Sequence, residues 1–271
     1  GVDMDNKHQV TVIVTDPQKV PQKNINVIVK NDLGDKATGK TDKNGEVTVP
    51  EVEKTEHHSA YVVGYTDGTF GPERNMTRSE AAAIFARLLA DKNGDNISPV
   101  AKTKFSDVPA YAWYSGYVKY LNNNGVTYGH SKTIFAPDEQ ITRAEFTTMA
   151  VRFFDVYGDG DAEIMEQFKS FDDVSDGYWA AEYIKAAAKH GWITGYGDGS
   201  FRADRQITRA EVVTIVNRLL GREADLDYVS DNLRKLNTFP DVSRRYWAYS
   251  DILEAANTHN AILGTEESWY K

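Results

Sequence analysis

The sequence contains no cysteine, which excludes disulfide bonds and thiolate chemistry. It contains no apolar run near the roughly 20 residues that a membrane-spanning helix needs, so we expect no insertion into a membrane. The basic excess that favours a nucleic-acid partner is also missing, because the formal net charge is −9. What is present, 41% hydrophobic and 26% charged residues in a chain of 271, is typical of an ordinary folded protein of about two domains. No signal peptide precedes Gly1, so we expect a piece of a longer protein.

Residues 1–56 predict a small β domain that ends in a linker. Val10, Val12 and Val14 alternate as on one face of a strand over 9–14, and further strands are expected over 26–30 and 45–50. A sheet this small is marginal alone, so we expect it to pack on the next part of the chain or to be the remnant of a larger Ig-like or carboxypeptidase-regulatory-like domain. The polar residues 51–59 are expected to form the linker.

A four-residue motif, Thr-Arg-Ala/Ser-Glu, recurs three times, at 77–80, 142–145 and 208–211. Its copies are 65 and 66 residues apart, so a whole supersecondary unit is repeated. Each candidate functional group therefore appears in triplicate, which favours a binding module over an enzyme with one active site.

Two helical patterns alternate from residue 60 onward. One follows Phe-x-Asp-Val at 105–108, 171–174 and 239–242, with a Trp eight positions after each Phe, at Trp113, Trp179 and Trp247. The other is a turn, at 64–70, 128–135 and 195–201, followed seven residues after its Phe by the Thr of the motif and an apolar helix. A motif helix comes first without a Trp helix before it, and a Trp helix comes last without a motif helix after it.

This count predicts a closed pseudo-threefold assembly in place of an open solenoid. The expected boundaries are 57–104 for the first module, completed by 239–262, then 105–170 and 171–238, with a closing Trp-helix segment and tail at 239–271. The fold class is therefore expected to be mainly α, a central helical bundle with three lobes, beside the N-terminal β domain.

These motifs resemble the S-layer homology family over roughly residues 60–262. The resemblance implies three modules that anchor an extracellular protein to the cell wall or S-layer of a Gram-positive bacterium. It implies a wall polysaccharide as partner, a secondary cell-wall polymer with pyruvylated N-acetylmannosamine, and other S-layer subunits as a second class of partner. It also implies binding grooves between modules that use the motif arginine. The middle turn departs from the family, because Lys132 and Thr133 replace Asp-Gly, and this weakens the prediction for its groove.

The Thr and Glu of the motif have a structural explanation, the capping box, in which each satisfies a backbone N–H at the helix start. The Arg between them opposes the helix dipole, so it needs another reason. One is an anion site, because an arginine beside a helix N-terminus suits a carboxylate. The alternative is a salt bridge to Asp107, Asp173 or Asp241. Replacing each motif arginine by alanine is expected to preserve folding and to weaken wall binding unequally.

The tryptophans are favoured as core residues, with a groove wall that stacks a sugar as the alternative. The Asp-Gly pairs are turn residues first and sugar-binding residues second. The full predicted carbohydrate-binding set is Arg78, Arg143, Arg209, Asp67, Gly68, Asp198, Gly199, Tyr65, Tyr196, Trp113, Trp179 and Trp247, and Tyr128 is a further candidate for the groove lining.

No catalytic residue, cofactor or metal site is predicted. The acidic stretches 91–95 and 155–161 lack the spacing of a calcium-binding EF-hand and are expected to be solvated loops. Two other functions stay open, a glycan hydrolase that uses paired carboxylates and an adhesin that binds a protein.

Overall fold

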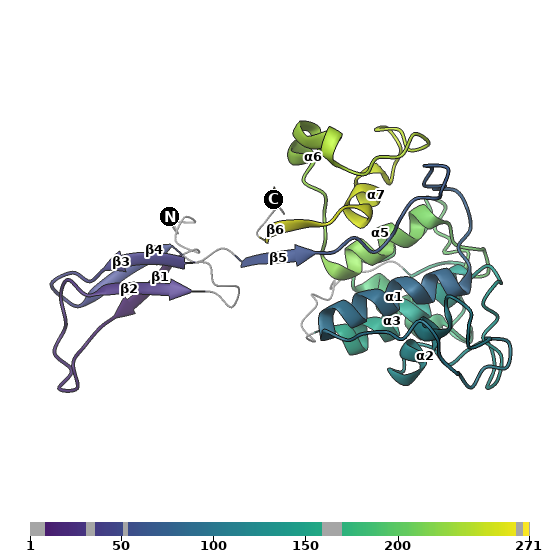
Figure 1. Cartoon of the computed structure of the whole chain (residues 1–271), viewed down its shortest axis with the longest axis horizontal. Helices are drawn as coiled ribbons and strands as arrows, with labels where there is room; N and C mark the ends of the chain where they lie inside the picture. Colours follow the sequence, from purple (N-terminus) through teal and green to yellow (C-terminus); the bar gives the residue numbers. More distant parts are fainter. Residues whose placement is uncertain (1–8, 31–35, 51–53, 159–169, 264–267, 271) are drawn as a thin grey trace. The chain divides into compact units, whose positions relative to one another are not determined.

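The computed structural model describes residues 9–30, 36–50, 54–158, 170–263 and 268–270, and the chain divides into two units (Figure 1). The strand unit comprises Gly1–His58 with Thr258–Lys271, and the helical unit comprises Ser59–Asn257. More of the described residues are in helices than in strands, so the fold is mixed and leans towards helix. The sequence predicted a mainly α fold beside a small β domain. None of the helices in these ranges is both long and apolar enough to cross a membrane.

The first four strands pair as two antiparallel ladders. These are β1 (Gln9–Ile13) with β4 (Glu46–Pro50), and β2 (Asn26–Lys30) with β3 (Lys36–Lys40). The strands expected near 9–14, 26–30 and 45–50 are confirmed. The sequence analysis missed β3, because its residues Lys-Ala-Thr-Gly-Lys lack the apolar alternation of a half-buried strand.

A third sheet pairs residues 54–58 with the C-terminal strands. In it β6 (His259–Leu263) lies between β5 (Lys54–His58) and β7 (Ser268–Tyr270), all antiparallel. The expectation of a linker over 51–59 is wrong for residues 54–58, which form β5, whereas residues 51–53 lie outside the described part of the chain. The partner of β5 comes from the other end of the sequence, so its polar residues give no local strand signal.

The helical unit contains both predicted kinds of helix. The motif helices are α1 (Arg78–Asn93), α3 (Arg143–Tyr157) and α5 (Arg209–Leu220). The Trp helices are α2 (Ser115–Asn123), α4 (Ala181–Lys189) and α7 (Tyr249–Ala256), each beginning two residues after its Trp. A short α6 (Leu226–Asn232) with a 3-10 turn at Leu233–Lys235 was not expected.

The motif helices form the centre of the core. α3 contacts both α1 and α5, and each motif helix contacts the Trp helix that follows it in the repeat, α2 on α1, α4 on α3 and α7 on α5. Phe85 of α1 packs against Phe146 and Phe153 of α3, with ring centroids 5.3 and 4.8 Å apart, and all three side chains are fully buried. All five alanines of α1 (Ala81, Ala82, Ala83, Ala86 and Ala90) are buried as well. α1 is therefore apolar around most of its circumference, as a central helix must be.

All three motif helices begin with the predicted capping box. The hydroxyls of Thr77, Thr142 and Thr208 accept a hydrogen bond from the N–H three residues later, and the Glu at that position accepts one from the N–H of the Thr. The capping interpretation of Thr and Glu is confirmed.

The residues just before the three capping threonines form a closed ring of backbone hydrogen bonds. The N–H of Met76 donates to the carbonyl of Ile207, that of Ile207 to Ile141, and that of Ile141 back to Met76. All three side chains are buried. The first and third copies therefore contact each other as directly as neighbours in the sequence do.

The Asp of each Phe-x-Asp-Val segment caps a turn. Asp241 accepts hydrogen bonds from the N–H groups of Phe70 and Gly71, 2.9 and 2.7 Å away. Asp107 does the same for residues 135 and 136, and Asp173 for residues 201 and 202. Asp241 lies near the C-terminal end of the helical unit, whereas the turn that it caps lies near the beginning of that unit.

The two acidic stretches begin as helix ends, where the sequence analysis expected solvated loops, and residues 94 and 95 follow α1 outside the helix as expected. Residues 91–93 end α1 and residues 155–157 end α3, while residues 159–161 lie outside the described part of the chain.

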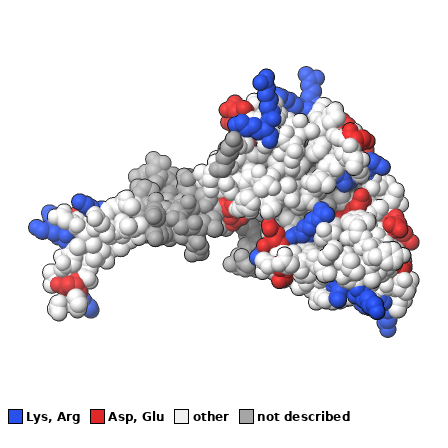
Figure 2. Space-filling view, viewed as in Figure 1, with Lys and Arg blue, Asp and Glu red and all other residues white. Residues whose placement is uncertain are grey.

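Acidic and basic side chains are interspersed over the visible face of the helical unit (Figure 2). Charge recognition on this face therefore depends on local grooves, because no large region of it carries one sign.

Candidate functional site

Three grooves of similar construction are present in the helical unit, with volumes of about 360, 280 and 250 Å³. Groove 1 is lined by Arg78, Glu145, Arg152, Tyr128 and Trp179. Groove 2 is lined by Arg143, Glu211, Arg218, Tyr196 and Trp247. Groove 3 is lined by Arg209, Glu80, Arg87, Tyr65 and Trp113.

Each groove takes its parts from three places in the repeat. One copy gives the motif Arg, the next gives the turn and one face of its motif helix, and the following segment gives the Trp. In groove 1 that face consists of Glu145, Thr148, Met149 and Arg152, which stand at positions i, i+3, i+4 and i+7 of α3. Groove 3 combines Arg209 of the third copy with α1 of the first, so this groove exists because the two ends of the repeat meet.

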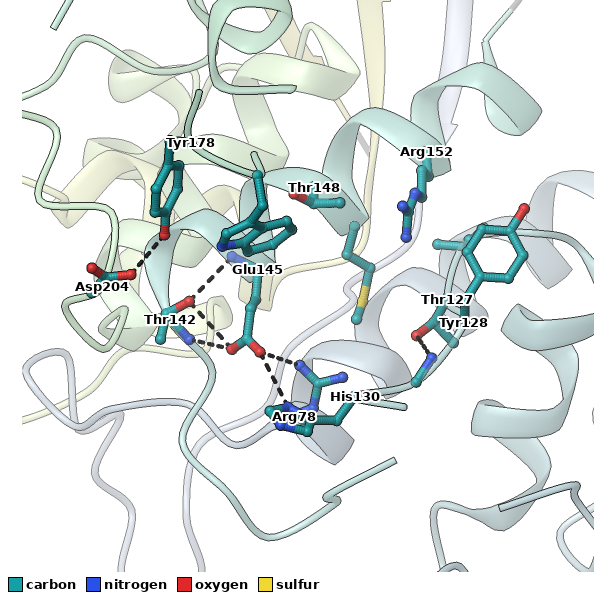
Figure 3. A pocket seen from close by; sticks show the side chains of 14 residues that line it. Arg78, Thr127, Tyr128, His130, Thr142, Glu145, Thr148, Arg152, Tyr178 and Asp204 are labelled. Atoms are coloured by element: carbon teal, nitrogen blue, oxygen red, sulfur yellow. Dashed lines mark hydrogen bonds and ion pairs between the residues drawn. The ribbon is translucent and has the colours of Figure 1, made fainter. Parts of the chain in front are cut away.

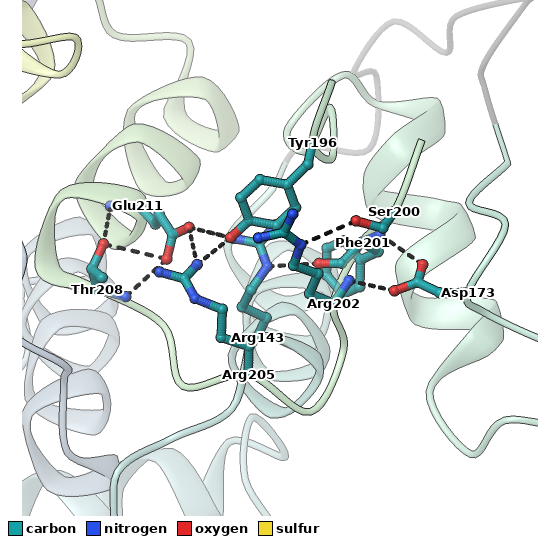
Figure 4. Close-up of polar contacts among 9 residues, drawn as sticks. All are labelled: Arg143, Asp173, Tyr196, Ser200, Phe201, Arg202, Arg205, Thr208 and Glu211. Atoms are coloured by element: carbon teal, nitrogen blue, oxygen red, sulfur yellow. Dashed lines mark hydrogen bonds and ion pairs between the residues drawn. The ribbon is translucent and has the colours of Figure 1, made fainter. Parts of the chain in front are cut away.

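The motif arginines are buried and bound within the protein. Arg143 is 6% exposed, and its Nε donates to the carbonyl of Phe201 at 2.9 Å (Figure 4). Its Nη1 lies 3.0 Å from Oε1 of Glu211, whose Oε2 accepts the N–H of Thr208. The guanidinium also stacks on the rings of Tyr196 and Phe201, 4.9 and 4.7 Å from their centroids.

Arg78 repeats this arrangement and Arg209 varies it. Arg78 donates from Nε to the carbonyl of Phe135 at 2.8 Å and pairs with Oε1 of Glu145 at 3.0 Å. Arg209 donates from Nε to the carbonyl of Phe70 and from Nη2 to that of Val63, both at 2.9 Å. Burial lowers the pKa of Arg209, and the charges of Tyr65 and Glu80 oppose the shift. Glu80 lines the same groove as Arg209.

Two sequence interpretations change here. The ionic partner of the motif arginine is the Glu of the next copy for Arg78 and Arg143, whereas Asp107, Asp173 and Asp241 cap backbone N–H groups. The motif Glu therefore has two roles, a helix cap through one oxygen and a counter-ion through the other. Arg78 and Arg143 still have Nη2 without a hydrogen-bond partner among the described residues, so each can offer a donor to a ligand.

Glu211 is the most heavily bound of the three glutamates. Burial raises its pKa, but the N–H of Thr208, the charge of Arg143, and the hydrogen bonds from Tyr196 and Arg205 outweigh burial, so the pKa lies below its usual 4.5. The hydrogen bond from Tyr196 to Glu211 is 2.8 Å long (Figure 4). Burial and this bond raise the pKa of Tyr196, which remains a neutral donor.

The tryptophans are exposed, and the expectation that they pack in the core is wrong. Trp113, Trp179 and Trp247 are 55%, 57% and 58% exposed, and each lines one groove. Each stands two residues before its helix begins, so the apolar periodicity of that helix does not fix its direction. Beside Trp179, burial and a 2.6 Å hydrogen bond to Asp204 raise the pKa of Tyr178 to about 12 (Figure 3).

The Asp-Gly turn residues lie apart from the grooves. The carboxylates of Asp67 and Asp198 accept hydrogen bonds from residues 69 and 200 of their own turns. Gly68 and Gly199 have φ values of 83° and 87°, which glycine adopts without strain. None of the four is among the groove-lining residues, and neither is Lys132 or Thr133 of the altered middle turn. That departure leaves the largest groove intact.

The sequence analysis missed a second set of arginines, Arg87, Arg152 and Arg218. Each follows the Thr of its motif by ten residues, and this constant offset is the signal that could have found them. Arg152 donates to the hydroxyl of Tyr183 and stacks on the ring of Tyr128, 4.9 Å from its centroid. Arg87 donates to the hydroxyl of Tyr117. Every groove therefore contains two arginines, one buried and one on the helix face.

Comparison with known proteins agrees with the repeat. The S-layer homology domain family matches residues 51–82, 104–147 and 170–213. The chain is 37% identical to Cell surface glycoprotein 1 of Acetivibrio thermocellus over 217 residues, 78% of this chain and 9% of that protein. It is 36% identical to the Cellulosome-anchoring protein of the same organism over 226 residues, 82% of this chain and 47% of that protein.

Enzymes also occur among the relatives. The chain is 30% identical to an Amylopullulanase of Thermoanaerobacterium thermosulfurigenes over 165 residues, 61% of this chain and 8% of that protein. In all three comparisons the chain spans less than half of its relative.

Proposed function

The chain contains a region of S-layer homology domains, and on this premise we propose that it anchors a surface protein to the Gram-positive cell wall by holding wall polysaccharide in its three grooves. The cell wall or S-layer is then its location. The name of the Cellulosome-anchoring protein supports this proposal, because 82% of the present chain aligns with that protein.

One observation carries the proposal, the pairing of an exposed Trp with two arginines in every groove. An indole offers a flat apolar face for a sugar ring and one N–H donor. The planar guanidinium binds a carboxylate through two parallel hydrogen bonds. A groove with both groups therefore selects a sugar that carries an acid.

A pyruvylated N-acetylmannosamine has these two features, and we propose it as the group that each groove binds. The Trp contacts the sugar ring, and Arg87, Arg152 or Arg218 on the helix face contacts the pyruvate carboxylate. The buried Arg78 and Arg143 donate from Nη2, and Arg209 mainly positions the turn through the carbonyl of Val63. Asp67, Gly68, Asp198 and Gly199 act through the shape of their turns.

We further infer that the modules close into a pseudo-threefold assembly. The ring of hydrogen bonds among residues 76, 141 and 207 supports this, as does the cap that Asp241 places on residues 70 and 71. The first module is then 57–104 completed by 239–262, and the others are 105–170 and 171–238. Residues 1–56 remain proposed as a small Ig-like or carboxypeptidase-regulatory-like domain, and other S-layer subunits as a further partner.

A catalytic role receives no support from the grooves. Each groove contains one motif Glu, and all three cap helices. Groove 1 has a second carboxylate, Asp204, which accepts a hydrogen bond from Tyr178, and grooves 2 and 3 have no second carboxylate among their lining residues. A glycosidase needs two carboxylates on opposite sides of one bond. The Amylopullulanase is an enzyme of which this chain matches only 8%, so the similarity concerns a small part of that protein.

The test is retention of the chain by purified cell-wall sacculi. We expect retention to be lost when the wall polymer is extracted beforehand. Replacing Trp113, Trp179 and Trp247 together by alanine should abolish retention, since each removes about 1 kcal/mol or roughly fivefold in Kd. Tyr111→Ala is the control, because Tyr111 is 84% exposed and lines none of the grooves. Equal retention on extracted walls would overturn the proposal and favour a protein partner.

A further inference from the structure

The three grooves differ at one position beside the motif ion pair. Counting five residues back from the buried Phe of each turn gives Tyr65, His130 and Tyr196. The preceding residues correspond in space as well as in sequence, because a Cβ on Gly64, Gly129 or Gly195 would meet the Phe of the adjacent Phe-x-Asp-Val segment in each case. Tyr128, which the sequence analysis grouped with Tyr65 and Tyr196, therefore corresponds to residues 63 and 194.

His130 lies beside the motif glutamate of groove 1, at the place where a tyrosine contacts the equivalent glutamate in groove 2. Its Nδ1 lies 3.8 Å from Oε1 of Glu145, and the imidazole is 57% exposed at the edge of groove 1 (Figure 3). In groove 2 the hydroxyl of Tyr196 donates to Oε1 of Glu211 at 2.8 Å. A neutral phenol is thus replaced by an imidazole, which becomes a cation when it takes up a proton.

The fixed charges of groove 1 also differ from those of the other two. Groove 1 has two arginines against two carboxylates, because Asp204 lines it in addition to Glu145. Grooves 2 and 3 each have two arginines against one glutamate. With His130 neutral, groove 1 has no net charge from its lining, and with His130 protonated it has the same single positive charge as the others.

We propose that groove 1 binds the acidic glycan in a pH-dependent manner, tightly when His130 is protonated and weakly when it is neutral, whereas grooves 2 and 3 bind it independently of pH. This rests on the proposed function, since it assumes an acidic sugar as ligand. The wall anchor then has two grooves that are always available and one that is added as the surroundings become acidic.

The charged groups around His130 set the sign of this effect. Glu145 of α3 is its nearest charged partner, and Arg78 of α1 binds the same carboxylate oxygen. Arg152 of α3 and Asp204, which accepts a hydrogen bond from Tyr178, line the same groove. Protonated His130 attracts Glu145 and repels Arg78, and the ligand carboxylate adds a second negative charge nearby. A carboxyl group of this kind titrates near pH 3.5, so the ligand stays ionised over the relevant range. Binding is therefore stronger when His130 carries a proton, because its positive charge then attracts the ligand carboxylate.

The experiment compares binding at two pH values in the full chain. Trp113→Ala with Trp247→Ala weakens grooves 2 and 3 and leaves groove 1 intact. Titration calorimetry with a methyl glycoside of pyruvylated N-acetylmannosamine at about pH 8 and about pH 5.5 then assigns any pH dependence of Kd to groove 1, because grooves 2 and 3 are expected to bind independently of pH. We expect Kd to fall roughly fivefold at the lower pH, the ratio for about 1 kcal/mol, as for one exposed ion pair. Adding His130→Tyr should remove that pH dependence while binding persists.

The reciprocal protein provides the matched control. Trp113→Ala with Trp179→Ala leaves groove 2, which should bind equally at both pH values. Adding Tyr196→His there should create a pH dependence. If groove 1 binds with the same Kd at both pH values, or stays pH-dependent after His130→Tyr, the inference is wrong and the anchoring proposal stands. If the wild-type chain fails to bind the sugar at either pH, the proposed function itself fails.

Discussion

Replacing Arg143 by alanine should lower the free energy of unfolding of the helical unit. The sequence analysis expected instead that the motif arginines can be replaced without an effect on folding. Arg143 is 6% exposed and lies inside the core. Its loss leaves the carbonyl of Phe201 without its donor at Nε and removes one of two arginines from Glu211. The substitution therefore disrupts a buried network as well as a ligand contact.

The magnitude follows from these contacts. A hydrogen bond from a charged donor contributes about 1.5–3 kcal/mol. Breaking a buried ion pair by removing one partner costs about 3–5 kcal/mol. Glu211 retains Arg205 at 2.8 Å and the N–H of Thr208, so the lower end of that range applies. We expect a loss of about 3 kcal/mol in the free energy of unfolding.

Urea unfolding followed by far-UV circular dichroism measures this loss. With a slope of about 3 kcal/mol per molar urea, the midpoint should fall by about 1 M. Arg218→Ala is the matched control, because Arg218 lines the same groove from an exposed position and its loss should change stability by less than about 0.5 kcal/mol. An Arg143→Ala midpoint equal to that of Arg218→Ala would refute the reasoning.

Three other predictions concern the turns and the acid limit of stability. Asp241→Ala should cost about 2 kcal/mol by leaving two N–H groups unpaired, whereas Asp67→Ala, which affects only its own exposed turn, should cost less than about 1 kcal/mol, and equal urea midpoints would contradict this. Gly195→Ala should cost more than about 1 kcal/mol, because φ is +67° and the new Cβ would lie 2.4 Å from a phenylalanine ring, whereas Gly197→Ala has open space; thermal melts that coincide would count against it. The pKa of Glu211 is lowered on folding, so its stabilisation is complete above its unfolded value of 4.5 and is lost as the pH falls through the folded value; Glu211→Gln should flatten the decline of the urea midpoint below about pH 4.5, and an unchanged decline would argue against a depressed pKa.

The sequence predicted the repeated helices and their caps because both depend on local signals. A Thr with a Glu three residues later starts a helix wherever it occurs, and the threefold recurrence excluded coincidence. The exposure of Trp179 was not predicted, because the sequence analysis counted this residue as part of the apolar pattern of α4, whereas α4 begins two residues later. Strand β5 escaped it because the partner strand lies some 200 residues away.

The groove chemistry was predicted in part. The motif arginines were identified from their unfavourable place at a helix N-terminus, but their partner is the Glu of another copy, and no local pattern shows which copies meet. Arg152 and its two counterparts were overlooked although their offset from the motif is constant. The sequence analysis matched Tyr128 with Tyr65 because both are tyrosines of a turn. Aligning the turns on their buried Phe shows instead that His130 corresponds to Tyr65.

The ring of hydrogen bonds among residues 76, 141 and 207 has a consequence for the order of the chain. Each copy donates to one neighbour and accepts from the other, so no copy occupies an end position. The ends of the helical unit also meet, because the N–H groups of Tyr61 and Val62 both donate to the carbonyl of Ala255. We therefore expect that the chain can begin at another module without loss of these contacts, so a circular permutant that joins these ends and opens between two modules should keep the same three grooves.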